Sequence, residues 1–352
     1  MGVGRKFWGG FFLVLLAGAV TGCVRVEAGE RRRFQTVFVG SMDTVTRFTA
    51  YCRDDAEFDR ACEQVREGLE EADALFNAYR ADSVLSRVNA GAGAGSVAAE
   101  PALAAALEEC RVWQAAVPAV NIAMGSVLSL WHTARETGEP PGEETVAAAL
   151  AHTSMEAVRV TGTGEAMAVE ITDPALSLDL GGVAKGLTAR TIAAGLRESG
   201  LDCFLLDCGT STLVCAGTPP GKEGWTIALR NPDASLNQSG TENPPDTLGQ
   251  ITLKERCVGT SGDYQKYFEK NGTFYSHILD AATGCPASYV RAVTVLMEDA
   301  GAADFYSTAL FAQPYARARE LADRTPGLEA LWVFRDGSRA ATDGFPPLEP
   351  PA

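Results

Sequence analysis

The sequence predicts an α+β fold with mixed or antiparallel sheets and packed helices, in two closely joined lobes. Stretches with the two-residue period of a strand and stretches with the period of a helix follow one another without a regular β-α alternation. No internal repeat is visible, and 352 residues suffice for a large buried core. A doubly wound parallel sheet is therefore not expected.

Helices in the first half are recognised from apolar residues three or four positions apart, behind capping residues such as Asp54 or Asp55. Proline at a first helical position and glycine-rich stretches mark the boundaries. The predicted elements are a strand at 38–51, a helix at 54–79, a loop at 90–96, a helix opened by Pro101, and a turn at 138–142 before an alanine-rich helix.

The second half contains more strand patterns than the first. A double glycine, Gly181-Gly182, separates an apolar segment from a helical pattern and predicts a tight turn into that helix. The predicted elements are strands near 157–160, 168–171 and 177–180, a helix at 183–198, an apolar strand region at 203–214, and a polar, proline-rich, mobile insertion at 232–247.

The amino-terminal segment has the pattern of an export signal. Two basic residues, Arg5 and Lys6, precede a short apolar run, which ends in Val-Thr-Gly before Cys23. This is similar to a bacterial lipoprotein signal at residues 1–22, with Cys23 as the lipidated residue and 23–35 as a tether. An ordinary cleaved signal with a chance cysteine is the alternative. Lipidation predicts a chain anchored to the cell membrane on its extracytoplasmic (periplasmic) face.

The composition excludes several classes of partner and site. The formal net charge of −15 becomes −17 without the two basic residues of the signal, so binding to nucleic acid is not expected. The other eight cysteines form no recognisable disulfide framework and no C-x-x-C, which favours buried thiols with at most a bridge or two. The three histidines have no zinc-ligand spacing.

Two segments indicate a metal-assisted site for a phosphate-bearing ligand. Asp304 and Thr308 are four residues apart, so on a helix their oxygens project from one face. Such hard oxygens suit Mg²⁺ rather than zinc. Upstream, residues 178–186 combine a carboxylate, the double glycine and Lys185, a pattern suited to an anion at a helix start. A solvated helix face and an ordinary tight turn are the alternatives.

Two further residues are candidates on weaker grounds. His277 lies between a strand pattern and a turn, and a structural hydrogen-bonding role is its alternative. Tyr79, at the end of the first long helix, is suited to stacking on a planar ring, or else is a partly buried core tyrosine.

Taken in order, these motifs resemble the ApbE-type family of FAD:protein FMN transferases, also known as thiamine-biosynthesis lipoproteins. The resemblance extends from about Thr36 to Leu331 and predicts a flavin transferase domain at 36–340, with a tail at 341–352. Its motifs are Gly40-Ser-Met-Asp-Thr44, Tyr79 to Asn89, Leu178 to Gly186, Thr260 to Tyr264, Ser276-His-Ile-Leu-Asp280 and Ala303 to Phe311.

The resemblance implies that FAD lies in a cleft between the lobes with Mg²⁺ on its pyrophosphate. Asp304, Thr308 and the carbonyl of Gly182 (or of Ala184) would hold the metal, and His277 would be the base, with Asp280 behind it. The residues implied to contact FAD are Met42, Tyr79, Asn121, Ile122, Ala123, Asp179, Lys185 and Ile278. The family often has aspartate and threonine where this chain has Asn121 and Ala123.

The implied reaction is Mg²⁺-dependent transfer of FMN from FAD to a threonine or serine of a target protein, through a phosphoester bond and with release of AMP. The implied target is a flavoprotein subunit of an electron-transfer or ion-pumping complex. Two alternatives remain open from the sequence: an FAD pyrophosphatase that releases FMN and AMP, and a lipoprotein that only binds flavin.

Overall fold

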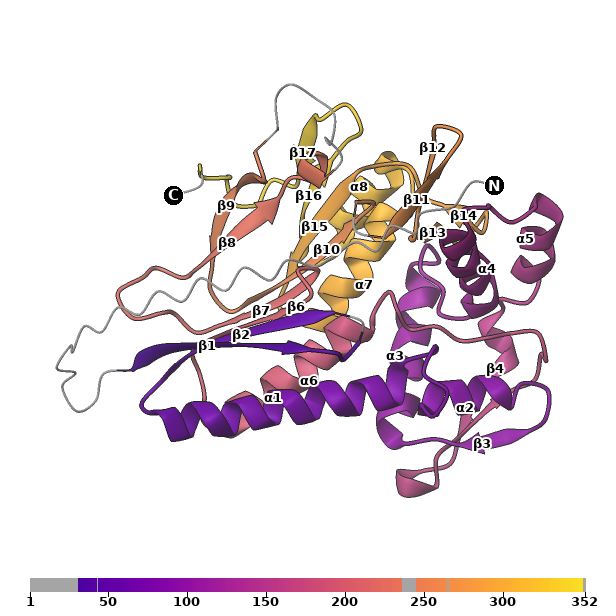
Figure 1. The fold of residues 1–352 in the computed structure, drawn as a ribbon, viewed down its shortest axis with the longest axis horizontal. Helices are drawn as coiled ribbons and strands as arrows, with labels where there is room; N and C mark the ends of the chain where they lie inside the picture. Colours follow the sequence, from indigo (N-terminus) through magenta and orange to yellow (C-terminus); the bar gives the residue numbers. More distant parts are fainter. Residues whose placement is uncertain (1–30, 43, 236–244, 265, 351–352) are drawn as a thin grey trace, which may run out of the picture. The chain divides into compact units, whose positions relative to one another are not determined.

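The centre of the structure is an eight-stranded sheet in which every neighbouring pair is antiparallel (Figure 1). The computed structural model describes residues 31–350 except 43, 236–244 and 265, so the predicted signal and Cys23 lie outside the described residues. In spatial order the strands are β1 (Arg32–Val39), β2 (Val45–Cys52), β6 (Phe204–Cys208), β7 (Thr212–Ala216), β10 (Arg256–Gly262), β15 (Ala292–Met297), β16 (Glu329–Val333) and β17 (Arg339–Ala341).

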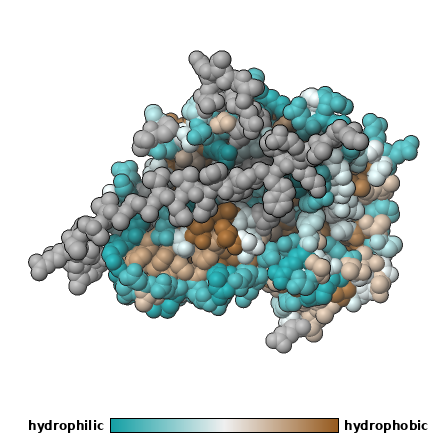
Figure 2. Space-filling view, viewed as in Figure 1, coloured by the Kyte–Doolittle hydropathy of each residue, from teal (hydrophilic) through white to brown (hydrophobic). Residues whose placement is uncertain are grey.

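Helices cover one face of this sheet and a hairpin covers the other. Along β7 the side chains alternate, because Val214 packs in the helix-side core while Leu213 and Cys215 pack in the hairpin-side core. The helices are α1 (Asp55–Phe76), α6 (Ala184–Glu198), α7 (Ala300–Phe311) and α8 (Tyr315–Arg324), and the hairpin is β8 (Trp225–Arg230) with β9 (Thr247–Leu253) and the turn η3 (Pro232–Ser235) between them. The outer side of α1 is a hydrophilic edge of the molecule (Figure 2).

A second, mostly helical part lies beside the sheet and shares its largest apolar core with α7 and α8. It contains α2 (Val84–Ala90), α3 (Pro101–Ala116), α4 (Gly125–Thr137), α5 (Glu143–Leu150) and a small antiparallel sheet of β3 (Ser96–Ala98), β5 (Ala168–Ile171) and β4 (Val158–Thr161) with the turns η1 (Met155–Ala157) and η2 (Gly164–Ala166). Two small hairpins, β11 (Tyr267–Lys270) with β12 (Thr273–Ser276) and β13 (Leu279–Asp280) with β14 (Cys285–Pro286), complete the chain.

The predicted α+β class is confirmed, and so are its main helices. The Asp54 carboxylate caps α1 by accepting a hydrogen bond of 2.8 Å from the Glu57 amide, and Pro101 occupies the start of α3. The helix after the double glycine is α6, which begins at Ala184. The helix that carries Asp304 and Thr308 is α7.

Three predictions about strands and boundaries were wrong. Residues 38–51 form a hairpin of two strands, because the chain reverses between β1 and β2 with Val39 opposite Val45. Residues 177–180 form no strand but only an isolated parallel bridge between Ser177 and Met124, and the Asn89 side chain takes up both backbone groups of Leu178, at 2.8 and 2.9 Å. Strand β1 begins at Arg32, inside the predicted tether.

The carboxy-terminal segment packs against the sheet rather than forming a free tail. Phe345 is buried in the core under β8 and β9, and Glu349 pairs with Gln250 through two backbone hydrogen bonds of 2.9 Å. Of the predicted insertion at 232–247, residues 236–244 lie outside the described part, and the rest connects β8 to β9.

Most of the described cysteines are buried. The eight cysteines within the described residues are all free thiols, and burial raises the pKa of Cys110 and Cys208 to about 12. Among the described helices, none combines the length and the apolar character that crossing a bilayer requires.

Candidate active site

A cleft of about 390 Å³ lies where the helical part meets the sheet and its helices. Its walls come from the end of α1, the segment 119–124, α4, the glycine turn before α6, the end of β10, and α7. The volume falls in the range of roughly 300–1,000 Å³ that is usual for ligand sites. All the residues predicted to bind metal or FAD line this cleft except Ala123, and His277 lines it too.

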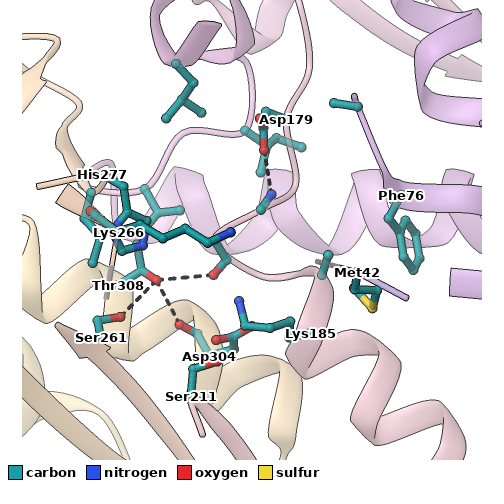
Figure 3. Close-up of a pocket in the computed structure, with 18 of the residues that line it drawn as sticks. Met42, Phe76, Asp179, Lys185, Ser211, Ser261, Lys266, His277, Asp304 and Thr308 are labelled. Atoms are coloured by element: carbon teal, nitrogen blue, oxygen red, sulfur yellow. Dashed lines mark hydrogen bonds between the residues drawn. The ribbon is translucent and has the colours of Figure 1, made fainter. Parts of the chain in front are cut away.

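The three predicted metal ligands meet on one wall, although they are far apart in the sequence. The Thr308 hydroxyl lies 3.3 Å from the Gly182 carbonyl oxygen and 3.3 Å from the Ser261 hydroxyl (Figure 3). It also donates to the Asp304 carbonyl at 3.2 Å, as a threonine within a helix commonly does. The glycine turn therefore lies directly against the exposed end of the Asp304–Thr308 face of α7.

Asp304 is a buried carboxylate with few compensating partners. Asp304 is only 4% exposed, and one of its carboxylate oxygens accepts a hydrogen bond of 2.9 Å from the Gly186 amide. Burial raises its pKa, against the opposing effects of the Lys185 charge and that amide. The alternative of a solvated helix face is excluded, since α7 is buried along nearly its whole length.

Positively charged side chains surround this wall. Lys185 comes from the first turn of α6, Lys266 from the segment before β11, and Arg135 from the last turn of α4. Figure 3 shows the amines of Lys185 and Lys266 pointing into the same cleft as Asp304 and Thr308. The carboxylates of Asp73, Asp179 and Asp304 line the same cleft, so its charges are balanced overall. The lysine amines beside the Asp304–Thr308 wall are what would attract an anionic ligand to that wall.

His277 is held against the backbone of Lys266. Its amide donates to the Lys266 carbonyl at 3.0 Å, and its Nδ1 lies 3.1 Å from the same oxygen. Because a carbonyl only accepts, Nδ1 carries the proton in the neutral ring and Nε2 is left as the acceptor. Burial within the cleft wall, followed by the charges of Lys185 and Lys266, lowers the pKa of His277 to about 3.

The predicted stacking residue Tyr79 stands at the other end of the cleft. Its ring is stacked on that of His132, with centroids 4.9 Å apart and planes 22° apart. Its hydroxyl donates to Asp179 at 2.9 Å, while the other oxygen of Asp179 accepts from the Gly181 amide at 2.7 Å. Asp179 thus connects the tyrosine to the glycine turn.

The segment 121–123 lies partly in the cleft wall and partly in the core behind it. Asn121 and Ile122 face the cleft, whereas Ala123 is fully buried in the core. The Asn121 side chain bridges the Thr153 carbonyl and the Ala123 amide, each at 2.8 Å. Ile278 reaches the cleft as well, but Asp280 does not, because its carboxylate is occupied by the Tyr289 hydroxyl and the Ala282 amide.

Sequence reasoning missed several cleft residues. Lys266 follows the Thr260–Tyr264 motif, and His132 and Arg135 belong to a helix that carries no motif. A basic residue just after one of the family motifs is a usable signal for Lys266. Nothing local marks His132, because only the packing of α4 beside Tyr79 gives it a place in the cleft.

Known proteins resemble this chain in sequence and in fold. The model of the ApbE family matches residues 42–332, which include every element of the cleft described above. The chain belongs to the ApbE family. The FAD:protein FMN transferase of Treponema pallidum is 28% identical over 350 residues, covering 96% of this chain and 93% of the relative. That of Vibrio cholerae is 29% identical over 259 residues, covering 72% and 74% of the two chains.

Solved structures of ApbE-family proteins share the fold. The ApbE protein of Thermotoga maritima superposes with a TM-score of 0.76 at 26% identity, covering 89% of this chain and 98% of the other. The apo form of the flavinyl transferase ApbE of Pseudomonas stutzeri gives a TM-score of 0.75 at 24% identity, with 91% and 98% coverage.

Proposed function

We propose that this chain is a Mg²⁺-dependent FAD:protein FMN transferase, which attaches FMN from FAD to a threonine or serine hydroxyl of a target protein and releases AMP. The observation that carries the proposal is the convergence of Gly182, Asp304 and Thr308 on one wall of a cleft that Lys185 and Lys266 also line. Relatives that cover most of this chain bear the name of that activity.

The oxygen donors of this wall fit Mg²⁺. Octahedral Mg²⁺ with ligands at about 2.1 Å places neighbouring oxygens about 2.9 Å apart, and the Gly182 and Thr308 oxygens are 3.3 Å apart before any adjustment. The Asp304 carboxylate supplies the negative charge that a hard cation requires. Mg²⁺ held there would neutralise charge on the pyrophosphate of FAD and make AMP a better leaving group.

The chain's own side chains would orient the two reactants. Lys185 and Lys266 would bind the pyrophosphate oxygens, and Tyr79 with Met42 would hold the flavin ring. The acceptor oxygen then forms its bond to the FMN phosphorus as the bond from that phosphorus to AMP breaks. The hydroxyl proton is transferred to Nε2 of His277.

The pKa of His277 is lowered chiefly by burial and, after that, by the charges of Lys185 and Lys266. A bound pyrophosphate would pair with both lysines and remove their part of the lowering, while the burial would remain. FAD binding would therefore raise the pKa of His277 only partway toward its ordinary range, which favours its role as the base in the ligand complex over the free protein.

We also propose the location and the partner that the sequence implies. Cys23 would carry the lipid anchor, so that the cleft works on the extracytoplasmic face of the membrane. The acceptor would be a flavoprotein subunit of an electron-transfer or ion-pumping complex. Labelling with radioactive palmitate and its loss in Cys23→Ala would test the anchor.

The decisive experiment for the activity is mass spectrometry of the full chain with FAD, Mg²⁺ and a flavin-accepting domain from the same cell. The expected result is a target heavier by one FMN residue, absent with Asp304→Ala. An unmodified target with FMN and AMP in solution would instead establish a pyrophosphatase. Intact, bound FAD would leave only a flavin-binding protein.

A further inference from the structure

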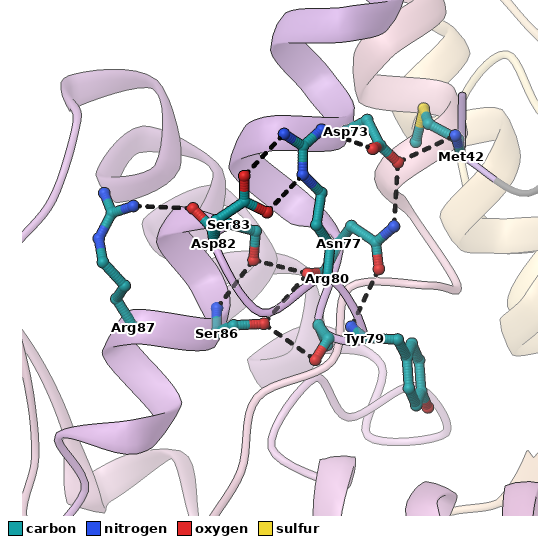
Figure 4. Close-up of polar contacts among 10 residues, drawn as sticks. Met42, Asp73, Asn77, Tyr79, Arg80, Asp82, Ser83, Ser86 and Arg87 are labelled. Atoms are coloured by element: carbon teal, nitrogen blue, oxygen red, sulfur yellow. Dashed lines mark hydrogen bonds and ion pairs between the residues drawn. The ribbon is translucent and has the colours of Figure 1, made fainter. Parts of the chain in front are cut away.

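One carboxylate beneath the cleft collects three donors from separate segments. Oxygen Oδ1 of Asp73, in the last turns of α1, accepts from the Met42 amide and from the Asn77 side chain, each at 3.0 Å (Figure 4). Its Oδ2 accepts from the Arg80 guanidinium at 3.0 Å. The Asp73 side chain is only 13% exposed and lines the cleft. Asp73 therefore contacts both the segment that carries Met42 and the segment that carries Tyr79.

On one side, Asp73 holds Met42 in a conformation that methionine rarely adopts. The backbone of Met42 has a φ of 54°, in the left-handed region. Such a residue persists only where its surroundings impose the conformation. Two contacts do so here: the bond from the Met42 amide to Asp73, and the Thr188 hydroxyl 3.4 Å from the Met42 sulfur.

On the other side, Asp73 holds the segment that carries Tyr79. The Asn77 side chain donates to Asp73 and accepts from the Tyr79 amide at 2.9 Å, so it relays the position of the carboxylate to the tyrosine. Burial acts to raise the pKa of Asp73, but the bonds from Asn77, Met42 and Arg80 outweigh it and lower that pKa. The carboxylate is thus charged at neutral pH and accepts all three donors at once.

We infer that Asp73 is a positioning residue for FAD, which couples Met42 and Tyr79 so that both walls of the flavin pocket form together. The inference rests on the proposed function, because it assigns those two residues to the flavin ring. A purely structural ion pair with Arg80 does not explain the arrangement. Arg80 already has a second carboxylate, Asp82, at 2.7 and 2.9 Å.

The test compares Asp73→Asn with Asp82→Asn in the full chain. An amide has one accepting oxygen where the carboxylate has two, so Asp73→Asn leaves at least one of the three donors facing an NH₂ group. Asp82→Asn disturbs the same arginine, but Asp82 contacts neither Met42 nor Asn77 in the described network. Dissociation constants for FAD come from fluorescence anisotropy, with melting curves to verify folding.

We expect Asp73→Asn to weaken FAD binding at least tenfold and to leave the bound flavin brighter, because ring stacking that quenches its fluorescence is lost. The Mg²⁺ concentration for half-maximal activity should stay within twofold of wild type, since the metal wall is untouched. Asp82→Asn should bind FAD within twofold of wild type.

Two results would overturn the inference: FAD affinity within twofold of wild type in Asp73→Asn, or an equal loss in Asp82→Asn. If Asp73→Asn does not fold, Asn77→Ala replaces it, because it cuts only the relay to Tyr79. That variant should brighten the bound flavin and weaken binding about threefold, and unchanged brightness would refute the coupling. A folded wild type that binds no FAD would refute the proposed function itself.

Discussion

Asp304→Asn should make the unliganded protein more stable while it abolishes Mg²⁺-dependent activity. The replacement keeps the shape of the side chain but removes a charge that is 4% exposed and compensated only in part by Lys185 and the Gly186 amide. Because burial raises the pKa of Asp304, its ionised form destabilises the folded state at neutral pH, and a neutral amide of the same shape removes that cost, which we expect to be about 2 kcal/mol.

The magnitude translates into a measurable change in melting temperature. With an unfolding entropy of about 2.1 cal/mol/K per residue, a chain of this size gains about 1 °C for every ~0.7 kcal/mol, so Asp304→Asn should melt ~3 °C higher. Mg²⁺ at a hundred times its dissociation constant adds about 2.7 kcal/mol to the wild type, or ~4 °C, and nothing to the variant.

The gain should also depend on pH. Burial raises the pKa of Asp304 above its ordinary value of 3.8, so the folded protein holds this proton more tightly than the unfolded chain does. The destabilisation is therefore absent below about pH 3.8 and grows as the pH rises toward and through the folded-state pKa. Asp304→Asn should exceed the wild type at pH 7 and match it near pH 4.

Differential scanning fluorimetry with and without Mg²⁺, at pH 7 and near pH 4, measures the predicted changes in melting temperature. Asp299→Ala is the matched control on the same helix, because it removes the cap that accepts the Ala302 amide at 2.7 Å. It should melt lower, having lost about 1 kcal/mol, and keep its response to Mg²⁺. The reasoning fails if Asp304→Asn melts below the wild type or still responds to Mg²⁺.

Three further variants test the neighbourhood. Gly186→Ala would place a Cβ 2.3 Å from the Ala300 carbonyl oxygen and 2.6 Å from the Asp304 Cβ, so urea titration should show a loss of about 1–3 kcal/mol and a weaker Mg²⁺ response. Gly195→Ala on the same helix has open space and should gain up to about 1 kcal/mol, because alanine has the higher helix propensity. The folded-state pKa of His277, near 3, lies below its ordinary 6.5, so the wild type should lose stability relative to His277→Gln as the pH falls from 6.5. We expect about 1 kcal/mol by pH 5, allowing for partial exposure of the ring, and an unchanged difference in urea midpoints would contradict this. Tyr79→Phe removes one hydrogen bond and should weaken FAD binding about threefold, against more than tenfold for Tyr79→Ala; equal effects would argue against stacking.

Much of the local structure was predictable because its causes are local. The capped helix that starts at Asp55, the helix entered through the double glycine, and the Asp304–Thr308 spacing follow from hydrogen bonds and apolar periods within a few residues. The predicted strand at 177–180 failed for the opposite reason. Its backbone partners come from the Asn89 side chain and from the backbone of Ile122 and Gly125, all distant in the sequence and without a local signature.

The sequence by itself determined the fold class, the main helices, the ordered motifs of the ApbE family and the residue types of the proposed metal site. Only the tertiary structure decided which of these residues come into contact in the cleft. It brought the Gly182 carbonyl within 3.3 Å of Thr308, Met42 onto Asp73, and Lys266 and His132 into the cleft. The reason is physical: a period of two or 3.6 residues records bonds to near neighbours, whereas contacts across 31 residues (Met42 to Asp73) or 126 residues (Gly182 to Thr308) depend on how the whole core packs.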